Sequence, residues 1–413
     1  MERRAPEASA ESAPLDVLLI NQYYPPSDAP TGLLLADLAE RLVAVGHRVS
    51  VLASRRAYED PRRTYPARER RNGVEVRRMR TIGVAGQGPG GRLLDYASFL
   101  VGTALHLVGR RRPDVVVALS TPPMLASVAV AGARLRGARS VYWVMDVYPQ
   151  IAFALGVLRA DSLPGRALER LARIALARAS VVVALGDSMA QILRANGARV
   201  VASVPNWIAG PPIPAPVDAA GLRAEWGWTD QVVVLYSGNL GRAYEFETAL
   251  GAAELLRDQP AVRFVFMGRG ARRAEIAAAV SGRGLTNVEL RDPLPRARLA
   301  LGLAAGDLHL VTLRAEAAGL LVPSKIFGTL AVGRPTLYVG PAASEVAALV
   351  TAAGCGVRIE PGDARGLAAA IRAYAADPER RRAEGARARL EHEQRYAPGS
   401  SLDRLVRLVE GRE

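Results

Sequence analysis

Short apolar runs alternate with longer helical patterns along most of the chain. The N-terminal half contains runs of strand length that are rich in valine, leucine and isoleucine: Leu15–Ile20, Arg48–Ala53, Val74–Arg80, Asp114–Leu119, Ser140–Met145, Ser180–Leu185 and Val200–Val204. Between the first two, residues 32–46 place apolar side chains at helical spacing and end on a glycine. Strands that alternate with helices form parallel sheets covered on both faces. The pattern therefore predicts an α/β fold.

The pattern stops after Asn206 and then starts again. Residues 209–216 read Ala-Gly-Pro-Pro-Ile-Pro-Ala-Pro, a composition typical of linkers. Further strand-like runs follow at Val232–Tyr236, Arg263–Met267, Val288–Leu290, Leu308–Leu313, Thr336–Val339 and Val357–Ile359. We therefore expect two Rossmann-like domains whose parallel sheets face each other across a cleft. The expected boundaries are a disordered tail 1–14, a first domain 15–206, a linker 207–217, a second domain 218–395 and a C-terminal helix 396–413 returning toward the first domain.

Length and composition agree with this organisation. The chain has 413 residues, half of them apolar, which suits two α/β domains better than one. A single cysteine, Cys355, excludes a disulfide framework, and the four histidines are too far apart in sequence for a local metal motif. No segment has the apolar length of a signal peptide or a membrane span. We expect a cytoplasmic protein that needs no metal or other cofactor.

The positive charge is concentrated in the N-terminal half. The formal net charge is +14, and up to Asn206 the chain has 28 arginines against 17 acidic residues. Such a field suits an anionic lipid surface, a polyanionic acceptor or nucleic acid. Aromatic residues are few, and no helix-turn-helix, RNA-recognition or zinc pattern is present, so we do not expect nucleic acid as a partner.

Lysine occurs only once, at Lys325, although Lys and Arg together number 54. A compositional bias toward arginine explains most of this excess, because either cation serves on a surface. The two differ where a compact ammonium must meet a phosphate in a confined space. Lys325 is therefore a candidate site residue on composition alone, with chance survival as the alternative.

The loops after the predicted strands are the natural ligand sites, because ligands of such sheets bind beyond the carboxyl ends of strands. One strand leads into Ser237-Gly238-Asn239-Leu240-Gly241 and then a helix near Tyr244–Arg257. Glycines in this position let backbone amides approach a phosphate, although a plain tight turn is the alternative. The dinucleotide fingerprint is incomplete, since the next strand ends without an acidic residue, at Met267-Gly268-Arg269-Gly270.

A second loop contains the single lysine. It ends in Val322-Pro323-Ser324-Lys325, and we expect Pro323 to occupy the first turn of the helix that follows. A hydroxyl, free backbone amides and an ammonium would then meet at a helix N-terminus. This combination predicts an anion site that can stabilise a departing diphosphate, against the alternative of a surface lysine.

Several blocks of the sequence together resemble the family 4 glycosyltransferases of the GT-B fold. They are Asn21–Pro26 with Thr31 and Gly32, Trp143–Pro149, Val204–Trp207, Tyr236–Gly241 and Val322–Lys325. The similarity runs from about Leu15 to the C-terminus and is greatest to the bacterial subgroup that builds O-antigen and capsule repeats, including fucosamine-type transferases. It implies a nucleotide-sugar donor in the second domain, a polyprenyl-diphosphate-linked saccharide acceptor and retention of configuration.

The resemblance also suggests site residues. For donor binding they are Gly32, Gly238, Asn239, Arg242, Arg269, Leu294, Glu316, Ser324, Lys325 and Glu345; for the acceptor they are Tyr23, Tyr24 and Asp146. Lys325 and Asp146 are the expected catalytic residues. The alternatives are that Asp146 caps a turn before Pro149 and that the two tyrosines pack at the domain cleft. Asp-x-Asp, which holds a metal on the donor in other folds, is absent from the sequence, which agrees with a metal-independent enzyme.

The sequence departs from the family pattern in two places. Many relatives carry an arginine and a lysine in the glycine loop, where this chain has Asn239 and Tyr244. The family's glutamates spaced eight apart would fall near Leu320 and Gly328, so that motif is missing. Lys325 is then expected to be the principal charge on the diphosphate, with Arg242 and Arg269 contributing.

Residues 92–108 form an apolar segment with arginine flanks at Arg92 and Arg110–Arg112. The segment is shorter than a membrane span and contains Asp95 and His106. A helix lying in the membrane interface fits this pattern, and so does a buried helix of the first domain. The resemblance favours the interface, at the inner leaflet of the membrane.

Three other functions remain open on the sequence. A sugar-nucleotide epimerase of the same build would need acid–base carboxylates, and no clear pair is apparent. A nicotinamide-dependent oxidoreductase is disfavoured by the incomplete glycine fingerprint. A non-catalytic scaffold on the membrane surface would use the basic N-terminal half.

Overall fold

The computed structural model describes residues 13–60, 62–82, 88–109, 112–214 and 216–413. Most of the expected tail, Arg110 and Arg111 of the arginine flank, and residue 215 of the expected linker lie outside the described residues. Contacts divide the chain into two compact units. Unit 1 comprises Met1–Trp143, Arg178–Val181 and Leu402–Glu413, and unit 2 comprises Val144–Ala177 and Val182–Ser401.

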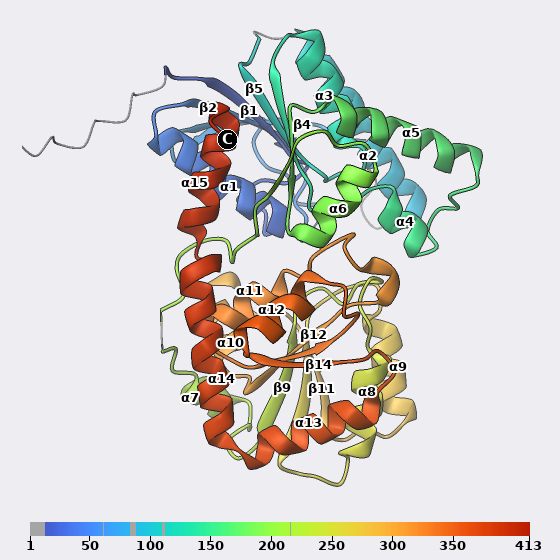
Figure 1. Ribbon diagram of the computed structural model, residues 1–413, viewed down its shortest axis with the longest axis vertical. Coiled ribbons are helices and arrows are strands. Elements are labelled where there is room, and N and C mark those ends of the chain that lie inside the picture. The colour runs from blue at the N-terminus through green and yellow to red at the C-terminus, as the bar shows by residue number, and fades with distance from the viewer. Residues whose placement is uncertain (1–12, 61, 83–87, 110–111, 215) are drawn as a thin grey trace, which may run out of the picture. The chain divides into compact units, whose positions relative to one another are not determined.

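The first sheet has the hydrogen-bonded order β3-β4-β2-β1-β5-β6-β7-β8. Figure 1 labels its strands β1, β2, β4 and β5. Its strands are β1 (Asp16–Ile20), β2 (Arg48–Ser54), β3 (Arg68–Arg71), β4 (Val74–Met79), β5 (Val115–Leu119), β6 (Arg139–Trp143), β7 (Val181–Ala184) and β8 (Val201–Ser203). The helices of this part are α1 (Pro30–Ala44), α2 (Gly88–Gly109), α3 (Leu125–Leu135), α4 (Gln150–Ala154), α5 (Leu163–Arg178) and α6 (Asp187–Ala195). The edge strand β3 is antiparallel to β4 and was not predicted, because its Arg-Glu-Arg-Arg sequence has no apolar pattern.

The core of unit 1 forms where α2 and α3 cover the central strands. Leu18 and Ile20 of β1 pack with Phe99 and Leu107 of α2, and all four side chains are buried. These residues belong to the continuous apolar runs that predicted the strands, as expected for a parallel sheet covered by helices. Burial of this set holds α2 against the sheet.

Helix α2 nevertheless has a second apolar face that is exposed. Leu94, Val101 and Leu105 lie at helical spacing and are 56%, 60% and 70% exposed. Phe99 faces the core, as the interpretation of a buried helix predicted, and the opposite side presents an apolar stripe to solvent. The membrane-interface interpretation stays a prediction. No helix within the described ranges combines the length and apolar character that a bilayer crossing requires.

The second sheet has the order β11-β10-β9-β12-β13-β14, and all its pairs are parallel. Its strands are β9 (Val232–Ser237), β10 (Val262–Met267), β11 (Val288–Arg291), β12 (Leu308–Thr312), β13 (Thr336–Val339) and β14 (Gly356–Ile359). Its helices are α7 (Ala220–Glu225), α8 (Glu247–Leu255), α9 (Arg273–Gly282), α10 (Leu299–Ala304), α11 (Lys325–Ala331), α12 (Glu345–Ala353), α13 (Ala364–Ala376) and α14 (Pro378–Glu391). The predicted α/β class with two largely parallel sheets is confirmed.

Alternate side chains of the second sheet enter two separate cores. Tyr236 and Phe264 pack with residues of α8 and α13 on one face, whereas Leu235 and Val265 pack with α7 and α10 on the other. This alternation follows from the strand repeat of two residues. With both faces covered, only the loops at the strand ends remain available for chemistry.

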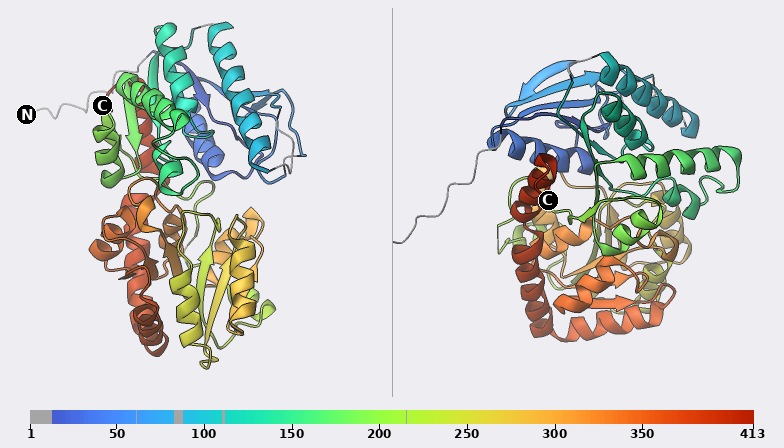
Figure 2. Two further views of the ribbon diagram at one scale, coloured as in Figure 1. Left: turned by 90° about the vertical axis from the view of Figure 1, so that its right-hand side faces the viewer. Right: turned by 45° about the horizontal axis from the view of Figure 1, so that its top comes forward.

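The C-terminal helix α15 (Pro398–Glu410) contacts the start of the chain within unit 1, where its last turns lie next to α1 (Figure 2). Arg41 of α1 donates to Asp403 at 2.6 Å, and His47 lies 3.2 Å from Glu410. The side chains of His47 and Glu410 are buried, so this polar contact helps to fix the position of α15 within its apolar packing. Residues 402–413 therefore complete unit 1 although they come last in the sequence.

Gly268, which follows β10, is required by close backbone packing. A Cβ added there would lie 1.8 Å from the carbonyl oxygen of Gly238, a distance that only a backbone shift can relieve. We expect Gly268→Ala to reduce the free energy of unfolding by about 1–3 kcal/mol, the usual cost of overpacking. Gly282→Ala is the matched control, since nothing lies within 4 Å of its added Cβ. Equal melting temperatures of the two variants would contradict this packing.

Candidate active site

The second sheet reverses its strand order between β9 and β12, which are hydrogen-bonded neighbours. The chain runs from β9 to β10 and β11 on one side, and from β12 to β13 and β14 on the other. The crevice outside such a reversal is where open α/β sheets bind ligands. The glycine loop follows β9, and the segment containing Ser324 and Lys325 follows β12, so both predicted elements belong to this point.

The glycine loop is held by the loop after β10. Gly238 N–H donates to the Met267 carbonyl at 2.9 Å, and Leu240 N–H donates to the Arg269 carbonyl at 2.8 Å. The Tyr236 hydroxyl donates to the Asn239 carbonyl at 2.6 Å. These bonds leave the side chain of Asn239 exposed at the surface of a loop whose backbone is fixed.

Helix α11 begins at Lys325, with Ser324 as its N-cap residue. The prediction that Pro323 lies in the first helical turn is wrong by two residues, because a tight turn precedes the helix: Ile326 N–H donates to the Pro323 carbonyl and Phe327 N–H to the Ser324 carbonyl, each at 3.2 Å. The Ser324 side chain makes no capping hydrogen bond and is exposed. The hydroxyl predicted to contact an anion is thus at the surface of the turn.

The Lys325 ammonium lies between two tyrosine rings. Its Nζ is 3.6 Å from the ring centroid of Tyr244 and 4.7 Å from that of Tyr236. These are cation–π distances, at which the negative face of a ring stabilises a charge. The Cε of Lys325 is also 3.5 Å from the position of a Cβ added to Gly238, so the side chain lies over the glycine loop.

No carboxylate of the described chain forms an ion pair with Lys325. Burial lowers the pKa of its amine to about 7, because removal from water penalises the charged form. The positive charge of Lys325 therefore has no negative partner among the described residues, and it lies beside exposed backbone of the glycine loop. An anion at this position would supply that partner and restore the charge.

The other residues predicted for the donor fall into two groups. Arg242 and Arg269 are exposed, and Arg269 is 3.8 Å from Asp292 in an exposed ion pair that constrains it little. Glu316 lies in a short 3₁₀ turn, where a backbone hydrogen bond and Arg314 lower the pKa of its carboxyl. Leu294 packs against one of the two cores of the second sheet. The ion pairs of Arg269 and Glu316 are with Asp292 and Arg314 and not with Lys325.

Glu345 has a structural partner that the sequence did not indicate. It lies in the first turn of α12, and its Oε1 accepts a hydrogen bond from the Met189 backbone amide at 2.9 Å. Met189 lies in the first turn of α6, so the carboxylate caps that helix within unit 2. A Cβ at Gly186 would collide with this side chain, which explains why that position is a glycine.

Asp146 comes after β6 and pairs with the segment that leads to Lys325. It forms an isolated antiparallel bridge with Leu321, and Val147 N–H donates to the Leu320 carbonyl at 2.8 Å, all within unit 2. Burial raises the pKa of the Asp146 carboxyl to about 6. A carboxyl with a pKa near neutrality can exchange a proton with a substrate group.

Three of the predicted site residues, Tyr23, Tyr24 and Gly32, belong to the N-terminal unit, and they differ in how closely they are packed. An added Cβ at Gly32 would lie 2.7 Å from the Tyr23 carbonyl oxygen, so the glycine allows α1 to approach this loop. Tyr24 is only 1% exposed, which places its ring in the core. Tyr23 is partly exposed and meets Tyr58 edge to face, with ring centroids 5.2 Å apart.

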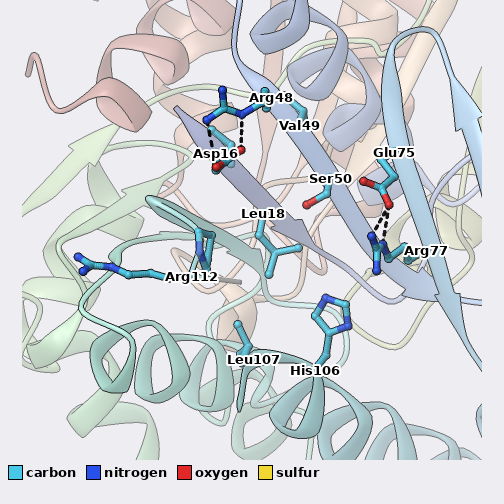
Figure 3. Close-up of a pocket in the computed structure, with 12 residues that line it drawn as sticks. Asp16, Leu18, Arg48, Val49, Ser50, Glu75, Arg77, His106, Leu107 and Arg112 are labelled. Atoms are coloured by element: carbon cyan, nitrogen blue, oxygen red, sulfur yellow. Dashed lines mark hydrogen bonds and ion pairs between the residues drawn. The ribbon is translucent and has the colours of Figure 1, made fainter. Parts of the chain in front are cut away.

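A pocket of about 840 Å³ lies at the opposite, amino-terminal ends of β1, β2 and β4 (Figure 3). Two pairs of its charged groups neutralise each other: Arg48 donates two hydrogen bonds to Asp16, and Arg77 pairs with Glu75. Arg112, which also lines the pocket, donates to the Gly137 carbonyl. Ligands of parallel sheets bind at the other ends of the strands. The β9/β12 reversal is therefore the better candidate for the active site than this pocket.

Comparison with known proteins identifies the family. Residues 32–207 match the glycosyl transferase 4-like domain, and residues 231–377 match the glycosyl transferases group 1. The chain belongs to the family 4 GT-B glycosyltransferases. Its similarity to WbjE of Pseudomonas aeruginosa, named as a probable glycosyltransferase, is 30% identity over 63% of this chain and 66% of that protein. WcaI of Escherichia coli K12, whose name describes a glycosyl transferase of colanic acid biosynthesis, is 29% identical over 87% of this chain and 91% of its own.

Solved structures share the fold of this glycosyltransferase. Sucrose-phosphate synthase from Thermosynechococcus elongatus superposes with a TM-score of 0.76 at 17% identity, covering 96% of this chain and 98% of that one. HepE from Anabaena in complex with UDP-glucose gives a TM-score of 0.71 at 18% identity, covering 96% of this chain and all of the other. At these identities the similarity concerns the architecture of the two domains.

The feature that the sequence did not reveal is the pair of rings around Lys325. Tyr236 and Tyr244 flank the glycine loop in sequence, but their contact with Lys325 depends on the position of α11. In the structure, both rings lie at cation–π distance from the Lys325 ammonium.

The glycosyltransferase has one lysine, so its ionisation can be measured directly. We expect ¹³C-lysine NMR to show Lys325 titrating at about 7, charged below that pH and neutral above it. In urea the same signal should titrate at about 10.4, as a solvated lysine does. Between about pH 7 and about pH 10.4 the unfolded chain keeps this proton and the folded chain does not. The free energy of unfolding should therefore rise with pH in this range.

Lys325→Met should abolish this dependence of the free energy of unfolding on pH. A folded-state midpoint near 10 would contradict the burial of the ammonium.

Proposed function

We propose that this glycosyltransferase moves a sugar from a nucleotide-diphosphate sugar to a saccharide linked to a polyprenyl diphosphate, in the biosynthesis of a bacterial surface polysaccharide such as O-antigen or capsule. The observation that carries the donor assignment is the Lys325 ammonium, which has no carboxylate partner among the described residues and lies over the glycine loop. The name of WcaI supports the polysaccharide, and the UDP-glucose bound to HepE supports a nucleotide-sugar donor.

The donor diphosphate would bind at the β9/β12 reversal. Its oxygens would accept hydrogen bonds from the Lys325 ammonium and the exposed Ser324 hydroxyl, with Asn239 on the facing loop. Arg242 and Arg269 are exposed near this loop and would add positive potential. Side-chain cations and backbone donors can stabilise a leaving diphosphate without a metal. We therefore propose a metal-independent reaction.

The proposed reaction retains the configuration at the anomeric carbon. The bond from this carbon to the diphosphate oxygen breaks, and the acceptor oxygen bonds to the same face of an oxocarbenium-like centre. The acceptor proton passes to the departing diphosphate, so the products are a glycoside and a nucleoside diphosphate. Lys325 would stabilise the developing negative charge, and Asp146 would orient the acceptor hydroxyl.

Loss of the Lys325 ammonium should slow this reaction strongly. We expect Lys325→Ala to lower turnover by roughly two orders of magnitude or more, as loss of a leaving-group stabiliser does. The assay offers UDP-, GDP- and TDP-sugars with a lipid-diphosphate saccharide and measures nucleotide release, with and without excess EDTA. Glu254→Gln, which removes an exposed carboxylate from α8, is the control.

The same assay separates the alternatives. Nucleotide release that requires the acceptor supports transfer, whereas interconversion of the donor without acceptor would identify an epimerase. Near-normal turnover of Lys325→Ala would refute the site, and loss of wild-type turnover in EDTA would refute metal independence.

We also propose that the enzyme works on the cytoplasmic face of the membrane, using the exposed stripe of α2. Leu94, Val101 and Leu105 present apolar side chains along one side of this helix, and Arg92 is exposed at its start. An apolar stripe with flanking arginines suits the boundary between headgroups and acyl chains. The lipid part of the proposed acceptor would be available there.

Making the stripe polar should release the enzyme from membranes. Together, Leu94→Ser, Val101→Ser and Leu105→Ser should cut the fraction that sediments with phosphatidylethanolamine–phosphatidylglycerol vesicles several-fold. The control carries Leu135→Ser, Leu171→Ser and Leu255→Ser, which are exposed leucines on other helices. Equal sedimentation of both triple variants would exclude α2 as the contact.

A further inference from the structure

A pocket of about 560 Å³ in unit 2 lies at the amino-terminal ends of β12 and β13. Asp307 of its lining directly precedes β12, Arg334 lies just before β13, and α14 supplies most of the other lining residues. Helix α14 packs beside α11 (Figure 1). Lys325 begins α11, whereas Val332 of the pocket follows the last residue of this helix. The pocket is therefore separate from the proposed donor site.

The lining of this pocket is strongly basic, with four arginines: Arg334, Arg381, Arg382 and Arg389. Its acidic residue, Asp307, already accepts a hydrogen bond from Arg223 at 2.9 Å. Arg389 pairs with Glu393 at 2.7 Å. The other three arginines form no ion pair with any carboxylate in the described part of the chain. Unlike the pocket at the ends of β1, β2 and β4, this one therefore keeps an excess of positive charge.

Two of these three arginines also bond to the carboxyl ends of helices. One terminal nitrogen of Arg334 donates to the carbonyl of Ala304, the last residue of α10, at 2.8 Å. One terminal nitrogen of Arg381 donates to the Ala375 carbonyl near the end of α13 at 3.2 Å. A helix end carries only about half a negative charge, and a guanidinium has five N–H donors. Arg382 is exposed and makes no hydrogen bond among the described residues, so helix capping does not account for it.

Close backbone packing holds the arginines of α14 next to Arg334. Gly385 lies one helical turn after Arg381, and a Cβ added there would collide with the carbonyl oxygen of Gly333. Burial lowers the pKa of the Arg334 guanidinium; Asp307 opposes this shift, and the charge of Arg381 adds to it. Like charges are thus kept near each other by contacts of the backbone, and a bound anion would relieve their repulsion.

The shape and chemistry of the pocket suit a phosphate group. Arg381 and Arg382 share one face of α14 with Gly385 and Ala386, whose small side chains leave space between the arginine turns. Guanidinium groups match the oxygens of a phosphate with paired, charge-assisted hydrogen bonds. A cation would be repelled, and a neutral sugar would leave the charges uncompensated. The volume exceeds that of a bare phosphate ion, so the remainder of a small ligand fits beside it.

We propose that the pocket between α14 and the segment before β13 binds the phosphate group of a small soluble compound through Arg334, Arg381 and Arg382. This accessory site is distinct from the donor crevice, and it does not depend on the proposed transferase function. Arg334 and Arg381 are held in place by their bonds to helix ends, and Arg382 supplies a guanidinium whose hydrogen bonds are all available to the ligand.

Calorimetry on the full chain with inorganic phosphate, pyrophosphate and glycerol 3-phosphate tests the site in chloride buffer. At least one of these anions should bind, and Arg382→Glu should weaken its binding about tenfold or more, because repulsion replaces a charge-assisted hydrogen bond. Arg382 is exposed and without partners among the described residues, so this variant should fold. The matched control is Arg365→Glu, the same change at an exposed arginine in the first turn of α13, and it should bind as the wild type does.

Lys325→Ala separates this site from the donor crevice, since it should leave the binding of the same anion unchanged. Binding that Lys325→Ala abolishes and Arg382→Glu preserves would overturn the inference and leave the proposed function intact. Equal weakening by Arg382→Glu and Arg365→Glu would reduce the effect to net charge and overturn it too, as would the absence of any binding. Sedimentation with phosphatidylglycerol vesicles that Arg382→Glu alone reduces, without binding of the three soluble anions, would overturn the assignment to a soluble compound in favour of a lipid headgroup.

Discussion

The contact of one ammonium group with two tyrosine rings is the interaction on which the candidate active site of this glycosyltransferase depends. Lys325 is held by two tyrosine rings and has no carboxylate partner among the described residues, so its positive charge is only partly compensated. In water such a charge would gain little from a phosphate, because solvent screens the attraction. In a site of low polarity the same attraction is several times stronger. The glycine loop, the short helix α11 and the close contact of Gly268 with Gly238 all keep the amine at this position.

The two sheets share one topological feature. In each, the strand order reverses at the centre, so the loops after the two central strands begin next to each other. At the reversal in unit 2, the Lys325 ammonium lies over the backbone of the glycine loop and against the ring of Tyr244.

Several predicted site residues turned out to have structural partners, and the reasons are local. Glu345 caps α6 through Met189, Gly32 allows α1 to approach the loop after β1, and the ring of Tyr24 is buried. Each of these contacts joins residues far apart in sequence or depends on the direction of a side chain. Charge and spacing along the chain do not contain that information. Family resemblance places a residue in a loop, but it does not say which way the side chain points.

The sequence by itself determined the α/β class and every strand of the two sheets except β3, and it singled out Ser324 and Lys325 as candidate site residues. It could do so because apolar periodicity and glycine or proline positions are local signals that survive without tertiary context. Tertiary structure alone decided the start of α11, the tyrosine pair around Lys325 and the cap that Glu345 provides for α6. These features bring together residues from separate strands, loops and helices. Their physical cause is the packing of both sheet faces, which fixes where each loop ends and how much water its side chains retain.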